Sequence, residues 1–196
     1  KNPLMVFVKL APIISLFIYV ISFSPALNKW NLFYFAIGIV SWSLFEYVTH
    51  RWVYHKNFKS KGAKWLFDTF HLHHHNTPKD YRVLNAGFLL MYPLALIFWS
   101  IFYLITQNHL DATWISLGLL SYYYFYENIH YFIHYKEFKN GYLRKMQLYH
   151  LHHHHRNWNK NYGNTTVFWD KILGTYDKRF KVFILSEEQK SHFIKS

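Results

Sequence analysis

The sequence lacks cysteine and is poor in acidic residues. With no cysteine among 196 residues, the chain excludes disulfides, thiolate zinc sites and cysteine-held iron–sulfur clusters. It has 10 acidic against 22 basic residues, a formal net charge of +12. In a soluble protein that excess would point to a nucleic-acid partner. No linker or low-complexity segment stands out, so we expect one domain covering residues 1–196.

Apolar and aromatic residues are abundant, at 52% and 22% of the chain. The mean hydropathy of −0.10 resembles that of a soluble protein, but histidine, tyrosine, tryptophan and lysine lower this average. The apolar residues are concentrated in four runs, at about 4–21, 30–54, 83–106 and 112–135. Each run approaches or exceeds the roughly 20 helical residues that cross a bilayer. The alternative, buried helices of a soluble bundle, rarely has wholly apolar runs this long.

The basic residues fall on alternate connections between these runs. Residues 51–82 hold seven and residues 136–195 hold twelve, whereas residues 23–29 hold one and residues 107–111 hold none. The positive-inside rule therefore predicts that both basic segments face the cytoplasm. Beside membrane spans, such residues favour anionic lipid headgroups or an acidic electron donor over nucleic acid. We expect a multi-pass protein of a prokaryotic inner membrane or the endoplasmic reticulum, with its active site on the cytoplasmic face.

Ten of the fifteen histidines form four clusters at or beyond the ends of apolar runs. The clusters are two pairs and two triples: His50 and His55; His71, His74 and His75; His130 and His134; His150, His153 and His154. Imidazole is the commonest protein ligand for transition metals. Ten imidazoles exceed what one ion binds, and all four clusters are expected on one membrane face. The pattern predicts a dinuclear metal site.

The spacings within the clusters suit helices. His130 and His134 are four residues apart, which places them on one helical face with Cβ atoms about 5–6 Å apart. Each triple has the spacing i, i+3, i+4, so its members share a face and can diverge to two metals. His50 and His55 are five apart, roughly 140° around a regular helix. Either the helix ends between them, or they serve different metals.

The remaining candidates surround these ligands. Glu46 and Glu127 each precede a histidine pair by about one turn, so each could accept the second ring proton of a ligand histidine. Solvated or capping roles are the alternative for both. His73, His152 and His155 are expected to support the ligands or to face solvent. The all-nitrogen set permits iron, zinc or copper; oxygen chemistry favours iron, and zinc could occupy the site in a purified preparation.

Five motifs resemble a known family. They are E-Y-V-T-H-R-W-V-Y-H at 46–55, H-L-H-H-H-N-T-P-K-D at 71–80, Y-E-N-I-H-Y-F-I-H-Y at 126–135, Y-H-L-H-H-H at 149–154 and Y-G-N-T-T-V-F-W-D-K-I-L-G-T-Y at 162–176. This order is similar to the fatty acid hydroxylase/sterol desaturase superfamily of membrane di-iron oxygenases. Within it, the pair–triple–pair–triple pattern is closest to fatty acid 2-hydroxylases. The resemblance covers residues 46–176.

The resemblance implies an all-α fold, in which about four transmembrane helices carry a cytosolic helical cap. It implies two iron ions on the ten clustered histidines and O2-dependent hydroxylation of a lipid acyl C–H bond. The chain would be a non-haem di-iron monooxygenase of lipid metabolism. Electrons would come from a separate donor, cytochrome b5-like or ferredoxin-like, because no cytochrome b5-like domain is present. Trp169 and Asp170 match the family pattern and are expected to be structural.

Two alternatives remain. A carotenoid or sterol hydroxylase or desaturase of the same superfamily would use the same ligands, and Glu127 stands where 2-hydroxylases more often have aspartate. A non-catalytic metal-binding membrane protein would place ligands and charges along a path through the bilayer. Here the histidines crowd one end of the spans, which favours the enzyme.

Overall fold

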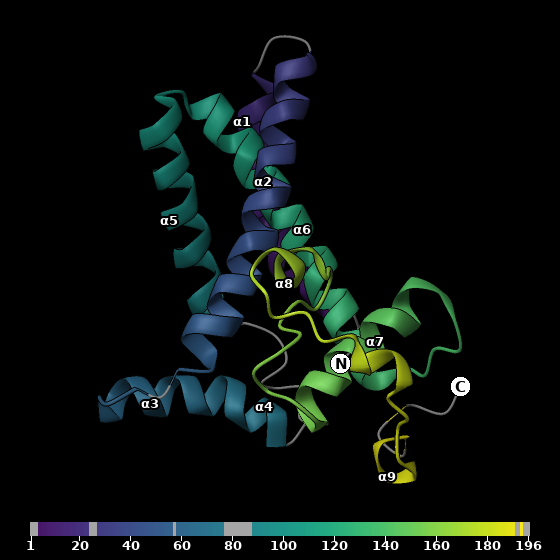
Figure 1. Ribbon diagram of the computed structural model, residues 1–196. Coiled ribbons are helices and arrows are strands. Elements are labelled where there is room, and N and C mark those ends of the chain that lie inside the picture. Colours follow the sequence, from purple (N-terminus) through teal and green to yellow (C-terminus); the bar gives the residue numbers. More distant parts are fainter. Residues whose placement is uncertain (1–3, 24–26, 57, 77–87, 191–192, 194–196) are drawn as a thin grey trace. The chain divides into compact units, whose positions relative to one another are not determined.

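The computed structural model of the chain describes residues 4–23, 27–56, 58–76, 88–190 and 193. Every regular element in this part of the chain is helical, which confirms the all-α prediction (Figure 1). The elements are α1 Leu4–Ser22, α2 Lys29–Val48, η1 Thr49–Tyr54, α3 Lys61–Phe67, η2 Asp68–Leu72, α4 His73–Asn76, α5 Phe88–Thr106, α6 His109–Tyr135, α7 Gly141–His155, α8 Phe168–Ile172, η3 Lys178–Val182 and α9 Glu187–Lys190.

The four apolar runs correspond to α1, to α2 with η1, to α5 and to α6. The start of the third run, residues 83–87, lies outside the described residues. Among the described residues one helix, Lys29–Tyr54, is long and apolar enough to cross a membrane, and Val6–Ser22 and Leu90–Thr106 are shorter apolar helices. The apolar helices are therefore present, and four membrane crossings stay a prediction.

The chain divides into two compact units. The first contains residues 1–43 and 85–125, and the second contains residues 44–84 and 126–196. All ten clustered histidines belong to the second unit.

Glycines set the close crossing of α2 and α6 within the first unit. A Cβ atom added at Gly38 would lie 1.9 Å from the carbonyl oxygen of Ile115, and one added at Gly118 would lie 2.0 Å from that of Phe35. These neighbours are helical backbone and cannot rotate away. A ring contact between Trp42 and Tyr123, with centroids 4.6 Å apart, continues the packing. Small residues thus allow the two backbones to touch.

We predict that Gly118→Ala destabilises the protein, whereas Gly62→Ala does not. Alanine at Gly118 would push α2 and α6 apart, and overpacking of this kind costs about 1–3 kcal/mol. A Cβ at Gly62 meets nothing within 4 Å, and alanine is the better residue in a helix by about 0.5–1 kcal/mol. Thermal unfolding in detergent measures both variants. Equal midpoints for the two variants would contradict the close crossing.

The first unit exposes many large apolar side chains. Examples that are at least half exposed include Leu16, Ile18, Leu32, Val40, Leu96, Ile97, Leu104 and Ile105. So many large apolar side chains at the surface suit a lipid environment.

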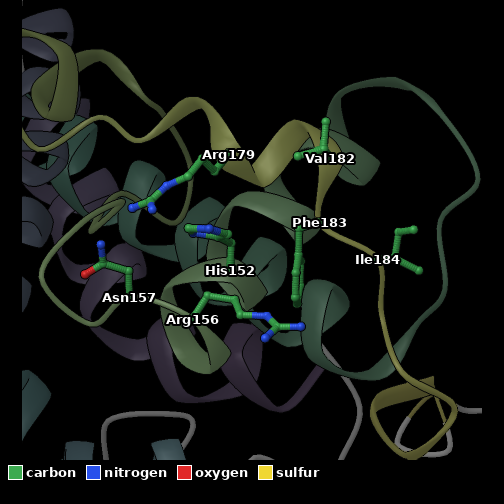
Figure 2. A pocket seen from close by; sticks show the side chains of 7 residues that line it. All are labelled: His152, Arg156, Asn157, Arg179, Val182, Phe183 and Ile184. Carbon is green, nitrogen blue, oxygen red and sulfur yellow. The ribbon is translucent and has the colours of Figure 1, made fainter.

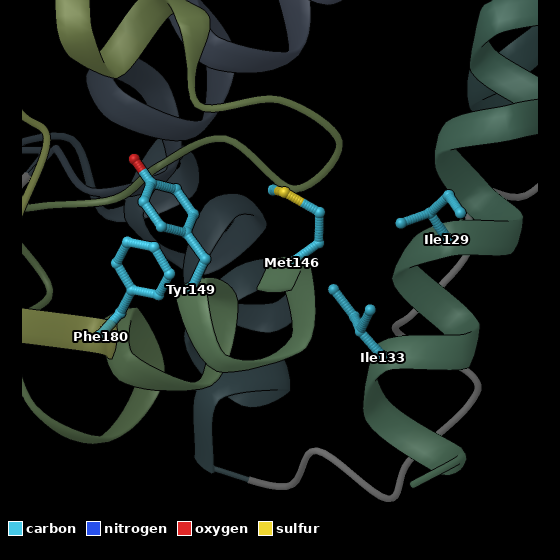
Figure 3. Close-up of a cluster of buried hydrophobic side chains, with 5 residues drawn as sticks. All are labelled: Ile129, Ile133, Met146, Tyr149 and Phe180. Atoms are coloured by element: carbon cyan, nitrogen blue, oxygen red, sulfur yellow. The ribbon is translucent and has the colours of Figure 1, made fainter. Parts of the chain in front are cut away.

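A buried apolar cluster joins α6, α7 and η3 in the second unit (Figure 3). Ile129 and Ile133 project from α6 towards Met146 and Tyr149 of α7, and the Tyr149 ring meets Phe180 edge-on at 5.0 Å. Ile133 and Tyr149 are fully buried. Because His130, His134 and His150 directly follow Ile129, Ile133 and Tyr149 in sequence, the cluster fixes the two helices, α6 and α7, that carry half of the clustered histidines.

Candidate metal centre

The second unit gathers nine of the ten clustered histidines into two groups. In each group, one ring nitrogen of every member lies within 4.8 Å of one nitrogen of every other member. The first histidine group is His50, His55, His71, His75 and His153, and the second histidine group is His74, His134, His150 and His154. The tenth, His130, lies beside the second group, because its Nε2 is 3.2 Å from His74 Nε2. The structure thus brings together all ten histidines that the sequence singled out.

Each group contains histidines from both the earlier and the later clusters of the sequence. His71 and His75 of the first triple join the first group, while His74 joins the second. In the later triple, His153 joins the first group, while the other two members join the second. Each triple therefore serves both groups, as its i, i+3, i+4 spacing allows.

His50 and His55 belong to one group because the helix between them widens. Thr49–Tyr54 is a π-helix, whose hydrogen bonds run from residue i to i+5. That geometry stacks residues five apart, and the helix ends at Tyr54 immediately before His55. The two ring centroids are 5.1 Å apart. Of the two alternatives set by the sequence, the structure matches convergence on one group and not separate metals. A second π-helix, Asp68–Leu72, carries His71.

Burial keeps the imidazoles neutral. Removal from water lowers the pKa of His55 to about 4 and that of His74 to about 3. It also lowers the pKa values of His150, His153 and His154 well below their usual range, and the neighbouring imidazoles add to the effect. Neutral imidazole is the form that binds metals, because its lone pair is free.

The ring nitrogens fit a metal better than they fit one another. Facing Nε2 atoms lie 3.1 Å apart in His55 and His153 and 2.8 Å apart in His134 and His150. Two ligands about 2.1 Å from one ion and at right angles to each other are about 3.0 Å apart. Nε2 of His50, whose Nδ1 is bound elsewhere, and both ring nitrogens of His154 are buried with no hydrogen-bond partner within the described chain. Such atoms are costly unless something binds them.

Backbone carbonyls orient two of the rings. His50 Nδ1 donates to the Tyr162 carbonyl at 2.5 Å, and His153 Nδ1 donates to the Lys160 carbonyl at 2.7 Å. These bonds fix the tautomer that leaves Nε2 free for an ion. Sequence reasoning missed both partners, since a carbonyl carries no side-chain signal.

Glu46 makes its hydrogen bonds to a loop segment that lies far away in sequence. The buried carboxylate accepts from the Asn164 N–H at 2.7 Å and from the Thr165 hydroxyl at 3.0 Å, rather than from a histidine ring. It lies one turn before His50, but the ring proton of His50 goes to Tyr162. Glu127 is buried at 3% exposure, and its role stays a prediction.

Three further histidines lie outside both groups. His73 and His155 are exposed. His152 is buried and faces a pocket of about 470 Å³, which Arg156, Arg179 and Phe183 also line (Figure 2). Of the four histidines at 152–155, the two middle ones belong to the histidine groups and the two outer ones do not.

The sequence matches a known protein family over most of its length. The profile described as fatty acid hydroxylase matches residues 35–175. The chain belongs to the fatty acid hydroxylase family. The match contains all ten clustered histidines and the segment up to Thr175.

Three relatives place the chain within this family. It is 34% identical over 147 residues to the ceramide very long chain fatty acid hydroxylase scs7 of Schizosaccharomyces pombe, which covers 72% of this chain and 42% of that protein. It is 34% identical over 144 residues to a dihydroceramide fatty acyl 2-hydroxylase of Arabidopsis thaliana, covering 71% and 59%. The human fatty acid 2-hydroxylase is 30% identical over 150 residues, covering 72% and 38%. The chain thus spans about half the length of these relatives.

A solved structure shares the fold. The structure described as full-length scs7p, with only its hydroxylase domain visible, matches with a TM-score of 0.79 and 27% identity. The match covers 90% of this chain and 67% of that one.

Proposed function

We propose that this chain is a di-iron lipid hydroxylase that inserts oxygen from O2 into an acyl C–H bond, in the manner of a fatty acid 2-hydroxylase. The observation that carries the proposal is the pair of histidine groups, two sets of buried neutral imidazoles with five members each once His130 is included with the second. The family match and the names of the relatives support an acyl substrate. No described feature favours a sterol or a carotenoid.

The ten clustered histidines would hold the two ions. Iron bound there would supply the redox chemistry that activates O2, which no amino-acid side chain provides. The protein's own contribution is to keep each imidazole neutral, to aim its free nitrogen, and to exclude water. Of the ten, His55 is among the least buried, and the others are at most 9% exposed. The set thus combines strong ligands with a dry interior.

The proposal extends to the membrane. The four long helices α1, α2 with η1, α5 and α6 would cross the membrane, and the clustered histidines would lie on its cytoplasmic face. The apolar exposure of the first unit and the basic residues of 51–82 and 136–195 support this topology. The same proposal treats residues 1–196 as one functional domain, because α2 and α6 carry chain from the first unit into the second.

The reaction also needs electrons from outside these residues. A small donor of the cytochrome b5 or ferredoxin kind would supply them to iron. The net charge of +12 favours an acidic partner surface.

The test is incorporation of labelled oxygen. Purified chain loaded with iron, given a reducing system, ¹⁸O2 and a long-chain acyl lipid, is expected to yield a lipid heavier by one ¹⁸O atom at carbon 2. Mass spectrometry with fragmentation locates the label. Label in a sterol or carotenoid but not in acyl lipid would move the chain to the alternative substrate class. No label in any lipid, together with metal flux across vesicles, would favour a metal-binding protein.

A further inference from the structure

The segment between α7 and α8 orients histidines of one group. We name residues 160–165 the 160–165 loop; all its residues except Lys160 are buried. Its two carbonyls at Lys160 and Tyr162 accept the Nδ1 protons of His153 and His50, both of the first histidine group. On the second group's side, the Nδ1 atoms of His74, His130, His150 and His154 have no partner within the described chain. The loop thus serves one group.

A buried carboxylate holds the middle of this loop. Asp170 has no exposed surface, and it accepts from the backbone N–H groups of Tyr162 and Gly163, each at 2.9 Å. It also accepts from the Thr175 hydroxyl at 2.7 Å. Hydrogen bonds to an ionised carboxylate are roughly twice as strong as neutral ones. Tyr162, whose N–H binds Asp170, is also the residue whose carbonyl accepts the proton of His50.

A second carboxylate holds the far end of the loop. Glu46 accepts from Asn164 and Thr165, as described above. Between the two anchors the loop is closely packed, since a Cβ added at Gly163 would lie 2.0 Å from the Thr166 carbonyl oxygen. The loop backbone therefore has little room to shift while both carboxylates are in place.

We infer that Asp170 and Glu46 are positioning residues for the ion of the first histidine group. They act through the 160–165 loop, whose carbonyls hold His50 and His153 in the tautomer that presents Nε2 to that ion. The inference rests on the proposed two-ion site and adds an asymmetry to it. Loosening the loop weakens the first ion and leaves the second in place.

The test is a titration of the metal-free full chain in detergent with Co²⁺, followed by its visible absorption. Wild type is expected to bind two equivalents. Asp170→Asn keeps the shape but not the charge, and it is expected to weaken one equivalent about 10–100-fold, the usual effect of removing a partner that orients a ligand. The other equivalent stays within twofold of wild type.

Asp177→Asn is the matched control. Asp177 is also a buried residue, at 9% exposure, and its carboxylate accepts from the backbone and guanidinium of Arg179. Only its backbone N–H and carbonyl bond the 160–165 loop, through the Asn161 side chain, and the substitution leaves these backbone groups in place. Its replacement is expected to leave both equivalents unchanged. Glu46→Gln is expected to reproduce the effect of Asp170→Asn, and it carries the test if that variant does not fold.

A second readout follows the rings directly. In ¹⁵N spectra of histidine-labelled metal-free chain, Asp170→Asn is expected to shift the ring signals of His50 and His153 and to leave those of the second group in place. Equal weakening of both Co²⁺ equivalents, or of neither, overturns the inference. A wild-type chain that binds fewer than two equivalents overturns the proposed two-ion site itself, so the two failures are distinguishable.

Discussion

Replacing His153 or His154 by alanine is expected to reduce hydroxylation at least about 100-fold, whereas replacing His155 leaves it within twofold. His153 belongs to the first histidine group and His154 to the second, and both are buried on α7. Each replacement removes one nitrogen ligand, and even losing a residue that merely orients a ligand typically costs 10–100-fold. His155 follows them directly in sequence but is exposed.

The measurement combines turnover with metal content in the three purified variants. His153→Ala and His154→Ala are expected to lose one ion each while keeping the helical circular dichroism of wild type. All three variants carry the same substitution within one helical turn, so a general disturbance of α7 would reduce the activity of all three alike. A His155→Ala variant as inactive as the other two would show that α7 is simply intolerant of change.

The metal-free protein is expected to lose stability as the pH falls below about 6.5. Burial lowers the pKa of His55 to about 4 and that of His74 to about 3, and it lowers those of His71, His75 and His153 as well. In the unfolded chain these imidazoles bind protons near pH 6.5, so acid favours unfolding. The stabilisation is fully present above pH 6.5, and it is lost progressively as the pH falls towards 4 and 3.

The size of this effect follows from the number of histidines. Lowering the pKa of one group by about 1 corresponds to about 1.4 kcal/mol, and the free energy of unfolding of a whole domain is only about 5–15 kcal/mol. A few protonations therefore suffice to unfold the second unit. Metal binds the grouped, neutral rings of the folded state more tightly than those of the unfolded chain, so it is expected to move the transition to lower pH.

Circular dichroism between pH 8 and pH 4, with and without Zn²⁺, measures the shift. A metal-free protein that keeps its full signal at pH 4 would show that the histidines are not buried. Coincident curves with and without Zn²⁺ would show that they bind no ion.

Much of this site could be predicted because histidine spacing is a local property. The i, i+4 pair of α6 and the i, i+3, i+4 triples lie on single helical faces whatever surrounds them, and the structure brings all ten histidines together. The assignment to groups could not be predicted. Whether His74 or His75 turns to a given group depends on how α4, α6 and α7 pack.

Two other features have no signal in the sequence. The residues of the π-helix at Thr49–Tyr54 carry no pattern that distinguishes it from an α-helix, so the five-residue gap left two alternatives open. The carbonyls that orient His50 and His153 belong to the backbone. The hydrogen bonds of Glu46 could not be predicted either, because closeness along the helix does not decide which neighbour reaches the carboxylate; the 160–165 loop, over 100 residues away in sequence, does.

The helical fold could be predicted from the apolar runs, but the number of membrane crossings could not. Apolar runs of 18–25 residues form helices in either lipid or a protein core. Hydropathy does not show which of these helices cross a membrane. For example, α6 has 27 residues, but its tyrosine, histidine and serine residues lower its hydropathy. Among described residues, Lys29–Tyr54 alone satisfies both length and apolarity.

The most direct test of the two-ion site is the iron content of the chain. Metal-free protein in detergent is titrated with Fe²⁺ without oxygen, desalted, and analysed for iron per chain by mass spectrometry. The two histidine groups predict saturation at two iron ions per chain, falling to one in His153→Ala. Saturation at one ion in the wild type, with all ten histidines present, would contradict the two-ion site.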